Sequence, residues 1–193
     1  MNSIKVIIQG YAQKLSDGRY KATSTTVLVH SAGKLILVDP GLIPAELKKA
    51  LGNEHLQIDD IDFVVVTHTH QDHARNSRIF DKSKILDLLP ATRGQIPEFL
   101  RVPDTDIAVI YTPGHVEKHI SLIVKTPAGK YAIAGDAFWW EDSQEQETDT
   151  LSLIQHTDPI AKDPVMLQNS RRELLGVADY IIPGHGKMFT TSR

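Results

Sequence analysis

The chain has 193 residues, a length at which one hydrophobic core forms without disulfides, and no linker is visible, so we expect a single domain over residues 1–193. It contains no cysteine, which excludes disulfides, thiolate metal sites and cysteine nucleophiles and leaves imidazole and carboxylate as metal ligands. The formal net charge of −3 does not favour electrostatic binding to nucleic acid, and no apolar run reaches the ~20 residues of a membrane helix.

The first part of the chain predicts strands and one short helix. The opening residues, MNSIKVIIQG, alternate like a strand and carry neither the basic region nor the cleavage site of a secretory signal, so we expect a cytoplasmic protein. Proline at the entry and glycine just beyond the end predict a helix over Pro44–Leu51. The predicted strands are Ser3–Ile8, Thr25–His30 and Lys34–Val38, the last two joined by a hairpin turn, and the continuous apolar run Phe63–Thr67.

The second half of the chain repeats the pattern of the first. The segments TTVLVHSAGKLILVD and ISLIVKTPAGKYAIAGD each contain a strand, an Ala-Gly-Lys turn and a second strand that ends on an aspartate, Asp39 or Asp136. An amphipathic helix is predicted over Asp163–Ala178, with Arg171 and Arg172 on its solvated face. The predicted strands are Ile107–Tyr111, Ile120–Lys125, Tyr131–Ala134 and Tyr180–Ile182.

Three histidines and an aspartate lie directly after the predicted strand Phe63–Thr67, in the stretch HTHQDH. His68 and His70 are two residues apart, so in extended backbone their side chains point to the same side and can bind one ion. If a helix begins there, Asp72 and His73 point to a neighbouring position. A polar loop can also collect histidines by chance, but the spacing H-x-H-x-D-H favours two adjacent metal sites.

Three further residues of ligand type each follow a glycine at the end of an apolar strand pattern. They are His115 in IYTPGH, Asp136 in AIAGD and His185 in IIPGH. Glycine permits the sharp backbone turn that presents a side chain at the end of a strand. Neutral imidazole and carboxylate suit zinc, iron or manganese, and a dinuclear centre needs about this many ligands, with one carboxylate bridging. The sequence therefore predicts a metal centre.

These ordered motifs resemble the metallo-β-lactamase superfamily, and the resemblance spans nearly the whole chain, from Asp39 to His185. It implies an α/β (α+β) fold, a four-layer αββα sandwich with two mixed sheets face to face and the metals at the strand ends along one edge. It also implies two divalent ions, with zinc expected and iron or manganese as alternatives. The implied ligands are His68, His70 and His115 for the first ion, Asp72, His73 and His185 for the second, and Asp136 as the bridge between them.

Features that the chain lacks narrow the resemblance to a small, single-domain subgroup of the superfamily. There is no cysteine ligand, and only eight residues follow His185, so no C-terminal helical domain of the glyoxalase II type is expected. The interval between Asp136 and His185 is too short for the inserted domain of the superfamily's large nucleases. The motifs GDAFWWED and DPIAKDPVMLQNSRRELLGVADYIIPGHG resemble a subgroup that has an RNA-cleaving relative.

Residues beside the implied ligands have more than one interpretation. Asp39 is expected to hydrogen-bond and orient the elements that bear the ligands, although a simple turn after a strand would also place an aspartate there. His119 is either an added acid or base beside the metals or, as we expect, a supporting residue behind the ligands. Trp139 and Trp140 are expected to form a wall of the substrate pocket, with packing in the core or in a homodimer interface as the alternative.

The implied activity is metal-dependent hydrolysis, in which a bridging hydroxide attacks the substrate. Asp72 and Asp136 are the expected catalytic carboxylates, and Asp72 would orient the nucleophile and help to protonate the leaving group. A small ester, thioester or lactone is the expected substrate, because the loop WWEDSQEQETD adds five acids where RNA would need cations. The alternatives are a phosphodiesterase acting on single-stranded RNA, a diiron redox enzyme and a non-catalytic metal-binding protein. No membrane partner is expected.

Overall fold

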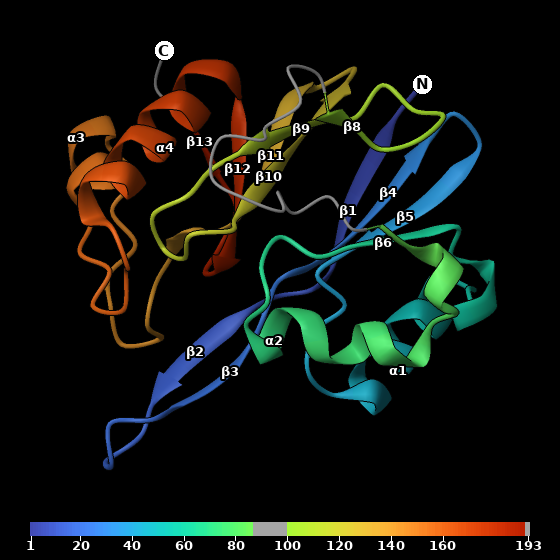
Figure 1. Cartoon of the computed structure of the whole chain (residues 1–193), viewed down its shortest axis with the longest axis horizontal. Coiled ribbons are helices and arrows are strands. Elements are labelled where there is room, and N and C mark those ends of the chain that lie inside the picture. The colour runs from blue at the N-terminus through green and yellow to red at the C-terminus, as the bar shows by residue number, and fades with distance from the viewer. Residues whose placement is uncertain (87–99, 192–193) are drawn as a thin grey trace.

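Two β-sheets pack face to face, and helices cover the outer face of each sheet (Figure 1). The computed structural model describes residues 1–86 and 100–191. Within these residues the first sheet has the strand order β1-β4-β5-β6-β7, and the second has the order β13-β12-β11-β10-β9-β8. The predicted αββα sandwich is therefore confirmed.

The first sheet comes from the N-terminal part of the chain and the second from the C-terminal part. The first contains β1 (Ser3–Ile8), β4 (Thr26–Ser31), β5 (Lys34–Val38), β6 (Phe63–Val65) and β7 (Ile85–Leu86). The second contains β8 (Leu100–Arg101), β9 (Ala108–Tyr111), β10 (Ile120–Thr126), β11 (Gly129–Trp139), β12 (Tyr180–His185) and β13 (Phe189–Thr190). Every predicted strand is thus present, with ends that differ by at most five residues.

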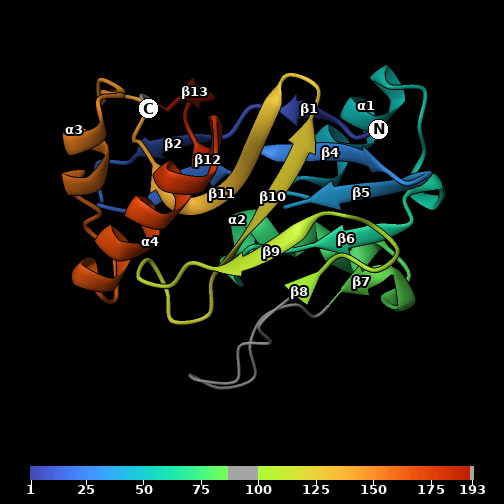
Figure 2. The same cartoon turned by 90° about the horizontal axis from the view of Figure 1, so that it is seen from above.

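Helices lie on opposite sides of the sandwich, and Figure 2 shows α3 and α4 beside β11 and β12, with α1 at the other end. They are α1 (Pro44–Asn53), α2 (Gln71–Ala74), α3 (Thr150–Gln155) and α4 (Pro164–Val177), with short 3₁₀ turns at Ile58–Asp60, Arg75–Ile79 and Lys82–Lys84. None of the helices in the described part of the chain is long and apolar enough to cross a bilayer.

The two repeated segments occupy equivalent positions in the two sheets. β4 and β5 form an antiparallel pair through a turn at Ala32 and Gly33, which have φ of 50° and 80°, as a tight hairpin turn requires. β10 and β11 form the corresponding pair in the second sheet. In each sheet the second strand of the pair then lies parallel to a strand that leads to predicted ligands, β6 beside β5 and β12 beside β11.

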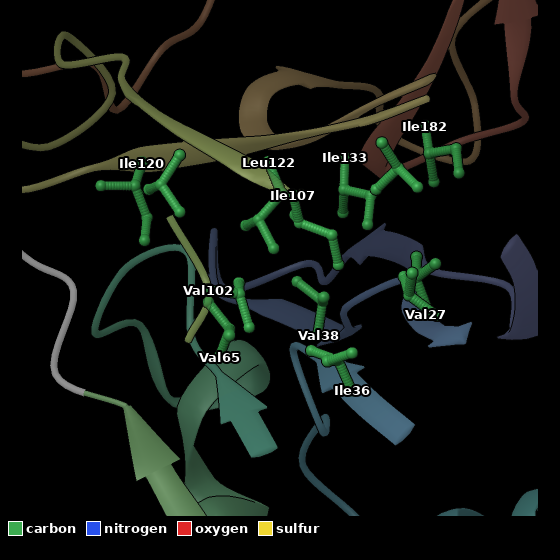
Figure 3. Packing of buried hydrophobic residues seen from close by; sticks show 13 residues of the cluster. Val27, Ile36, Val38, Val65, Val102, Ile107, Ile120, Leu122, Ile133 and Ile182 are labelled. Atoms are coloured by element: carbon green, nitrogen blue, oxygen red, sulfur yellow. The ribbon is translucent and has the colours of Figure 1, made fainter. Parts of the chain in front are cut away.

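The main core lies between the sheets, because successive residues of a strand face opposite sides. In β4, Val27 and Val29 face the second sheet, whereas Leu28 packs with Leu47 of α1 on the outer face. Burial of each such side chain stabilises the fold by about 1.5–3 kcal/mol. Figure 3 shows the branched side chains that meet between the sheets, with Val27, Ile36, Val38 and Val65 on one side and Ile120, Leu122, Ile133 and Ile182 on the other.

Arg171 does not lie on a solvated helix face, so that prediction was wrong. It is one helical turn from Leu167, on the stripe of α4 that packs against the second sheet, and it is 1% exposed. Backbone carbonyls accept hydrogen bonds from two of its nitrogens, from Nε to Ala137 O at 2.7 Å and from Nη1 to His156 O at 2.5 Å, whereas the buried Nη2 has no partner among the described residues. Burial lowers the pKa of Arg171 to about 10, which leaves it charged at neutral pH. Arg172 is exposed, as predicted.

A second hairpin, β2 (Tyr11–Lys14) and β3 (Tyr20–Thr23), was not predicted. It forms a separate two-stranded sheet that projects from the sandwich (Figure 1). Asp17 and Gly18 lie in its turn, and Gly18 has a φ of 81°. The Asp-Gly pair was the available signal, because it favours a tight turn between two strands.

Candidate metal centre

Seven side chains of ligand type converge at the edge where strand ends of both sheets meet. Four come from the loop and helix that follow β6, namely His68, His70, Asp72 and His73. The second sheet supplies His115 after β9, Asp136 within β11 and His185 at the end of β12. Their ligand atoms form two groups, in each of which all atoms lie within 4.8 Å of one another: His68, His70, His115 and Asp136 in the first, and Asp72, His73 and His185 in the second. The structure thus brings together every residue that the sequence nominated as a ligand.

The first group has the spacing of ligands around a single small ion. His115 Nε2 lies 3.1 Å from His70 Nδ1 and 3.4 Å from Asp136 Oδ2, and His68 Nε2 lies 3.6 Å from the same oxygen. A tetrahedral ion with bonds of 2.0–2.1 Å separates its ligand atoms by roughly 3.3 Å. The three imidazole nitrogens and the carboxylate oxygen of this group therefore lie close to the spacing that a tetrahedral ion requires.

The second group has a similar spacing and shares Asp136 with the first. His73 Nε2 lies 3.2 Å from Asp136 Oδ1, and His185 Nε2 lies 3.6 Å from that oxygen. Asp72 Oδ2 is 3.2 Å from His185 Nε2 and 4.0 Å from His73 Nε2. Asp136 therefore presents Oδ2 to the first group and Oδ1 to the second, which is the geometry of a bridging carboxylate.

Several buried atoms of these groups have no hydrogen-bond partner among the described residues. They are His68 Nε2, His73 Nε2 and Asp136 Oδ1. Leaving a buried polar atom unpaired costs about 1–3 kcal/mol, so native proteins rarely do so without a function. All three atoms can donate an electron pair and all three face the other ligands. The donor set therefore fits divalent metal ions.

The far nitrogens of four histidines are held by hydrogen bonds that turn the free ring nitrogen toward the site. His73 Nδ1 lies 2.8 Å from Asp39 Oδ2, and His115 Nδ1 lies 2.7 Å from Asp158 Oδ2. The remaining two contacts join His185 Nδ1 to Tyr11 O at 3.0 Å and His68 Nδ1 to Thr67 Oγ1 at 3.1 Å. Each of these histidines is thus oriented for binding through Nε2, while His70 presents Nδ1.

Asp39 links the end of β5 to the segment after β6 that carries His68, His70, Asp72 and His73. Its carboxylate accepts hydrogen bonds from the Thr67 backbone N–H at 2.7 Å and from Thr67 Oγ1 at 2.8 Å, in addition to its contact with His73. The residue has a φ of 51°, a strained conformation outside glycine and asparagine. The structure therefore places Asp39 where we expected it, beside the ligands and not among them.

Burial and mutual charge set the protonation of the ligands. Burial alone would raise the pKa of Asp136, but the imidazoles of His73 and His185 hold it well below its ordinary value. Burial, followed by the charge of His73, places the pKa of His68 well below its usual value, and burial also lowers that of His70. For His73 burial is again the largest single effect, but the charges of Asp136 and Asp39 together outweigh it and raise the pKa of His73 well above 6.5. Protons therefore compete with a metal ion more strongly at His73 than at His68 or His70.

His119 lies behind the first group and belongs to neither. Its ring centroid is 5.0 Å from that of His68, and its Nδ1 lies 2.9 Å from Thr112 Oγ1. Burial, followed by the charge of His115, lowers the pKa of His119 to about 3. An imidazole that is neutral at pH 7 has no proton to give as an acid of imidazolium type, so the position favours the supporting role over acid catalysis.

A cavity of about 540 Å³ opens over the two groups. His70, Asp72, Asp136 and His185 lie at its base, and among the described residues that line it Lys21 is the one lysine or arginine. The rest of the wall is largely apolar and comprises Tyr11, Tyr20, Leu42, Ile43, Trp139 and Ile160. The hairpin β2–β3 therefore supplies one side of the cavity.

The side chains of the two adjacent tryptophans point in different directions, so the prediction that Trp140 forms a wall of the substrate pocket was wrong. Trp139 lines the cavity, with its ring edge-on to Tyr20 at 5.7 Å. Trp140 instead packs in the outer core beside α4, with ring centroids 5.8 Å from Phe189 and 5.0 Å from His156. Because neighbouring residues of an extended chain point to opposite sides, both rings could not enter the same cavity.

Asp158 was missed in the sequence, although its carboxylate contacts His115. It lies in the loop between α3 and α4, within the segment HTDPI. An aspartate before a proline is typical of a turn, and nothing in its spacing relates it to His115. The contact arises from tertiary packing alone. The Tyr11 carbonyl that holds His185 was missed for the same reason.

A sandwich whose two sheets deliver histidines and aspartates to one edge is the architecture of the metallo-β-lactamase superfamily, and the chain belongs to that superfamily. The family model described as metallo-beta-lactamase superfamily matches residues 19–91. The chain is 30% identical to metallo-beta-lactamase domain-containing protein 1 of Xenopus laevis, over 97% of this chain and 81% of that protein. The Mus musculus protein of the same name is also 30% identical, over 97% of this chain and 74% of its own length.

Solved structures share the fold. A putative metallo-beta-lactamase from Thermotoga maritima superposes with a TM-score of 0.69 at 19% identity, covering 98% of this chain and 99% of that one. A quorum-quenching N-acyl homoserine lactone hydrolase superposes with a TM-score of 0.66 at 17% identity, covering 95% and 91%. At these identities the likeness shows the fold, and substrates do not follow from it.

Proposed function

We propose that this protein is a metallohydrolase with a dinuclear, zinc-type centre. The observation that carries the proposal is the carboxylate of Asp136, whose two oxygens each face one of two complete ligand groups. Nitrogen and oxygen donors at tetrahedral spacing suit zinc, and iron or manganese would accept the same donors. A pair of divalent ions bound there would lower the pKa of water toward neutrality and polarise a carbonyl or phosphoryl oxygen.

Asp72 is the ligand-type residue best placed to handle a proton. Its side chain is 22% exposed and lines the cavity, whereas that of Asp136 is only 5% exposed. Burial alone would raise the pKa of Asp72, but its hydrogen bond with His185 and the charge of His73 lower it, so the group is a carboxylate at neutral pH. Asp72 can therefore orient a nucleophile at the base of the cavity, accept its proton and pass that proton to the leaving group.

The cavity wall supports a small acyl substrate, such as an ester, thioester or lactone. Its aromatic and aliphatic residues can bury an apolar acyl group, and in the described part of the chain Lys21 is the only lysine or arginine that lines it. The N-acyl homoserine lactone hydrolase that shares the fold makes a lactone a sensible probe. RNA cleavage is the second candidate, because the rings of Tyr20 and Trp139 at the wall could stack on a base without any need for charge.

We expect aryl esters, thioesters or lactones to be hydrolysed faster than labelled single-stranded RNA. Binding over several nucleotides draws on a basic groove, whereas the described residues of this cavity wall include one lysine and no arginine. The measurement is a side-by-side comparison of initial rates with zinc-loaded protein, and Asp136→Ala serves as the control for contaminating enzymes. If the wild-type protein cleaves only RNA, and does so only with metal bound, the expected order of substrates is wrong and RNA cleavage is the activity.

Acidification should release the second ion before the first. An imidazole must lose its proton to bind metal, and the raised pKa of His73 means that protons compete there at a higher pH than at His68 or His70, whose pKa values are lowered. After dialysis from pH 7.5 to pH 5, elemental analysis should find about one ion per chain where there were two. Return to pH 7.5 with zinc should restore the second ion. Metal content that stays the same at both pH values would contradict this.

A further inference from the structure

We propose that Asp158 is a positioning residue for the first metal ion, acting through His115. The inference rests on the proposed dinuclear centre. Asp158 Oδ2 lies 2.7 Å from His115 Nδ1, and the side chain of Asp158 is only 1% exposed. A carboxylate at this nitrogen accepts its N–H, fixes the tautomer and leaves the Nε2 lone pair directed at His70 and Asp136.

The loop that carries Asp158 is fastened directly to the loop that carries His115. The backbone N–H of Lys162 donates to His115 O at 3.1 Å, and that of Asp163 donates to Gly114 O at 2.9 Å. The other oxygen of Asp158 accepts the N–H of Ile160 at 3.0 Å. Two segments distant in sequence therefore run side by side, and the carboxylate is held at a fixed distance from the ring.

Arg171 anchors the other end of the same loop. Its buried guanidinium donates to the carbonyl of His156, just before Asp158, and to that of Ala137, next to the bridging Asp136. Lysine could not reach both carbonyls, because it lacks the planar fork of arginine. The loop between α3 and α4 is thus tied to the strand that supplies the bridge as well as to His115.

The two ligand groups are supported in the same way. Asp39 holds His73 in the second group at 2.8 Å, and Asp158 holds His115 in the first at 2.7 Å. The other oriented histidines, His68 and His185, contact a hydroxyl and a backbone carbonyl. Each proposed ion therefore has one histidine held by a buried carboxylate, and Asp158 is the member of this pair to which the sequence alone assigned no role.

The test is a titration of metal-free full-length protein with Zn²⁺ against a chromophoric chelator. Asp158→Asn keeps the size of the side chain but removes its charge, and it should weaken one of the two Zn²⁺ ions by about 10–100-fold while leaving the other within a few-fold. Asp158→Glu retains a carboxylate and should recover part of the lost affinity. The Co²⁺ absorption spectrum should change for the weakened site only.

Asp163→Asn is the matched control. Asp163 lies in the same loop and caps α4 by accepting the N–H of Met166 at 2.9 Å, but its side chain contacts no histidine. Asparagine keeps the oxygen that accepts this bond and caps a helix about as well as aspartate, so the control should keep its fold and leave both Zn²⁺ affinities unchanged. Wild-type affinity for both ions in Asp158→Asn would overturn the positioning role and leave the proposed function intact. Failure of the wild type itself to bind Zn²⁺ would overturn both.

Discussion

Asp136→Ala is expected to reduce zinc from about two ions per chain to one or fewer and to abolish most turnover. The carboxylate faces both ligand groups, at 3.4 Å from His115 Nε2 and 3.2 Å from His73 Nε2, so its removal takes a ligand from each ion. Replacing residues that merely support a ligand costs about 10–100-fold, and loss of a shared ligand should exceed that. Elemental analysis and initial rates with the best acyl substrate measure the two effects on the same samples.

Asp136→Asn separates charge from shape, because it keeps an oxygen that can bind one ion but lacks the second anionic oxygen. It should hold more zinc than the alanine variant and less than wild type. Far-ultraviolet circular dichroism of the metal-free proteins shows whether either variant has lost its fold. If Asp136→Ala retained two ions and full turnover, Asp136 would not be the bridge.

Gly114→Ala should destabilise the protein by about 2–6 kcal/mol and displace His115. Gly114 has a φ of 134°, which side chains avoid, and an added Cβ would lie 2.3 Å from the backbone N and Cα of Leu167 in α4. Backbone strain costs about 1–3 kcal/mol and overpacking about as much again, within a total stability of about 5–15 kcal/mol for a domain of ordinary size. Urea unfolding of the metal-free protein measures the change.

Gly176→Ala is the control for this substitution. Gly176 lies in the same helix α4 that Gly114 packs against, has no positive φ, and an added Cβ there would meet nothing within 4 Å. Alanine is the better helix former, so this variant should be about 0.5–1 kcal/mol more stable than wild type if the position is fully helical. Equal stability of Gly114→Ala and wild type would show that the loop between β9 and β10 can shift away from α4 without cost.

The strands of the sandwich and the ligand set were predictable from local patterns. Strand β5 has the predicted bounds Lys34–Val38, because a short apolar run that follows a turn is typical of a strand buried on both faces. His115, Asp136 and His185 each follow a glycine at the end of such a pattern, and the structure places them together at one edge. Ligand residues that directly follow a predicted strand can therefore be identified from the sequence alone.

Long-range packing was not predictable in the same way. The charge of Arg171 suggested a position in solvent, but its guanidinium is buried and donates hydrogen bonds to carbonyls of β11 and of the loop after α3. Asp158 reaches His115 only because the two loops lie side by side. Trp139 and Trp140 are neighbours in sequence, and the direction of the chain at the end of β11 decided which of them faces the cavity. In each case the contacting residue lies far away in the sequence, and such a contact produces no periodic pattern in the local sequence.

Neither ligand group can be completed by one sheet, and this has a consequence for folding. His68 and His70 need His115, and Asp72 and His73 need His185, so each ion would act as a cross-link between the N-terminal and C-terminal halves of the chain. An ion that binds only the docked sheets stabilises them by mass action, by about 2.7 kcal/mol when free zinc is a hundred times its dissociation constant. Either half of the chain expressed alone would lack a complete ligand group. Zinc uptake during refolding would therefore show when the two sheets pack together.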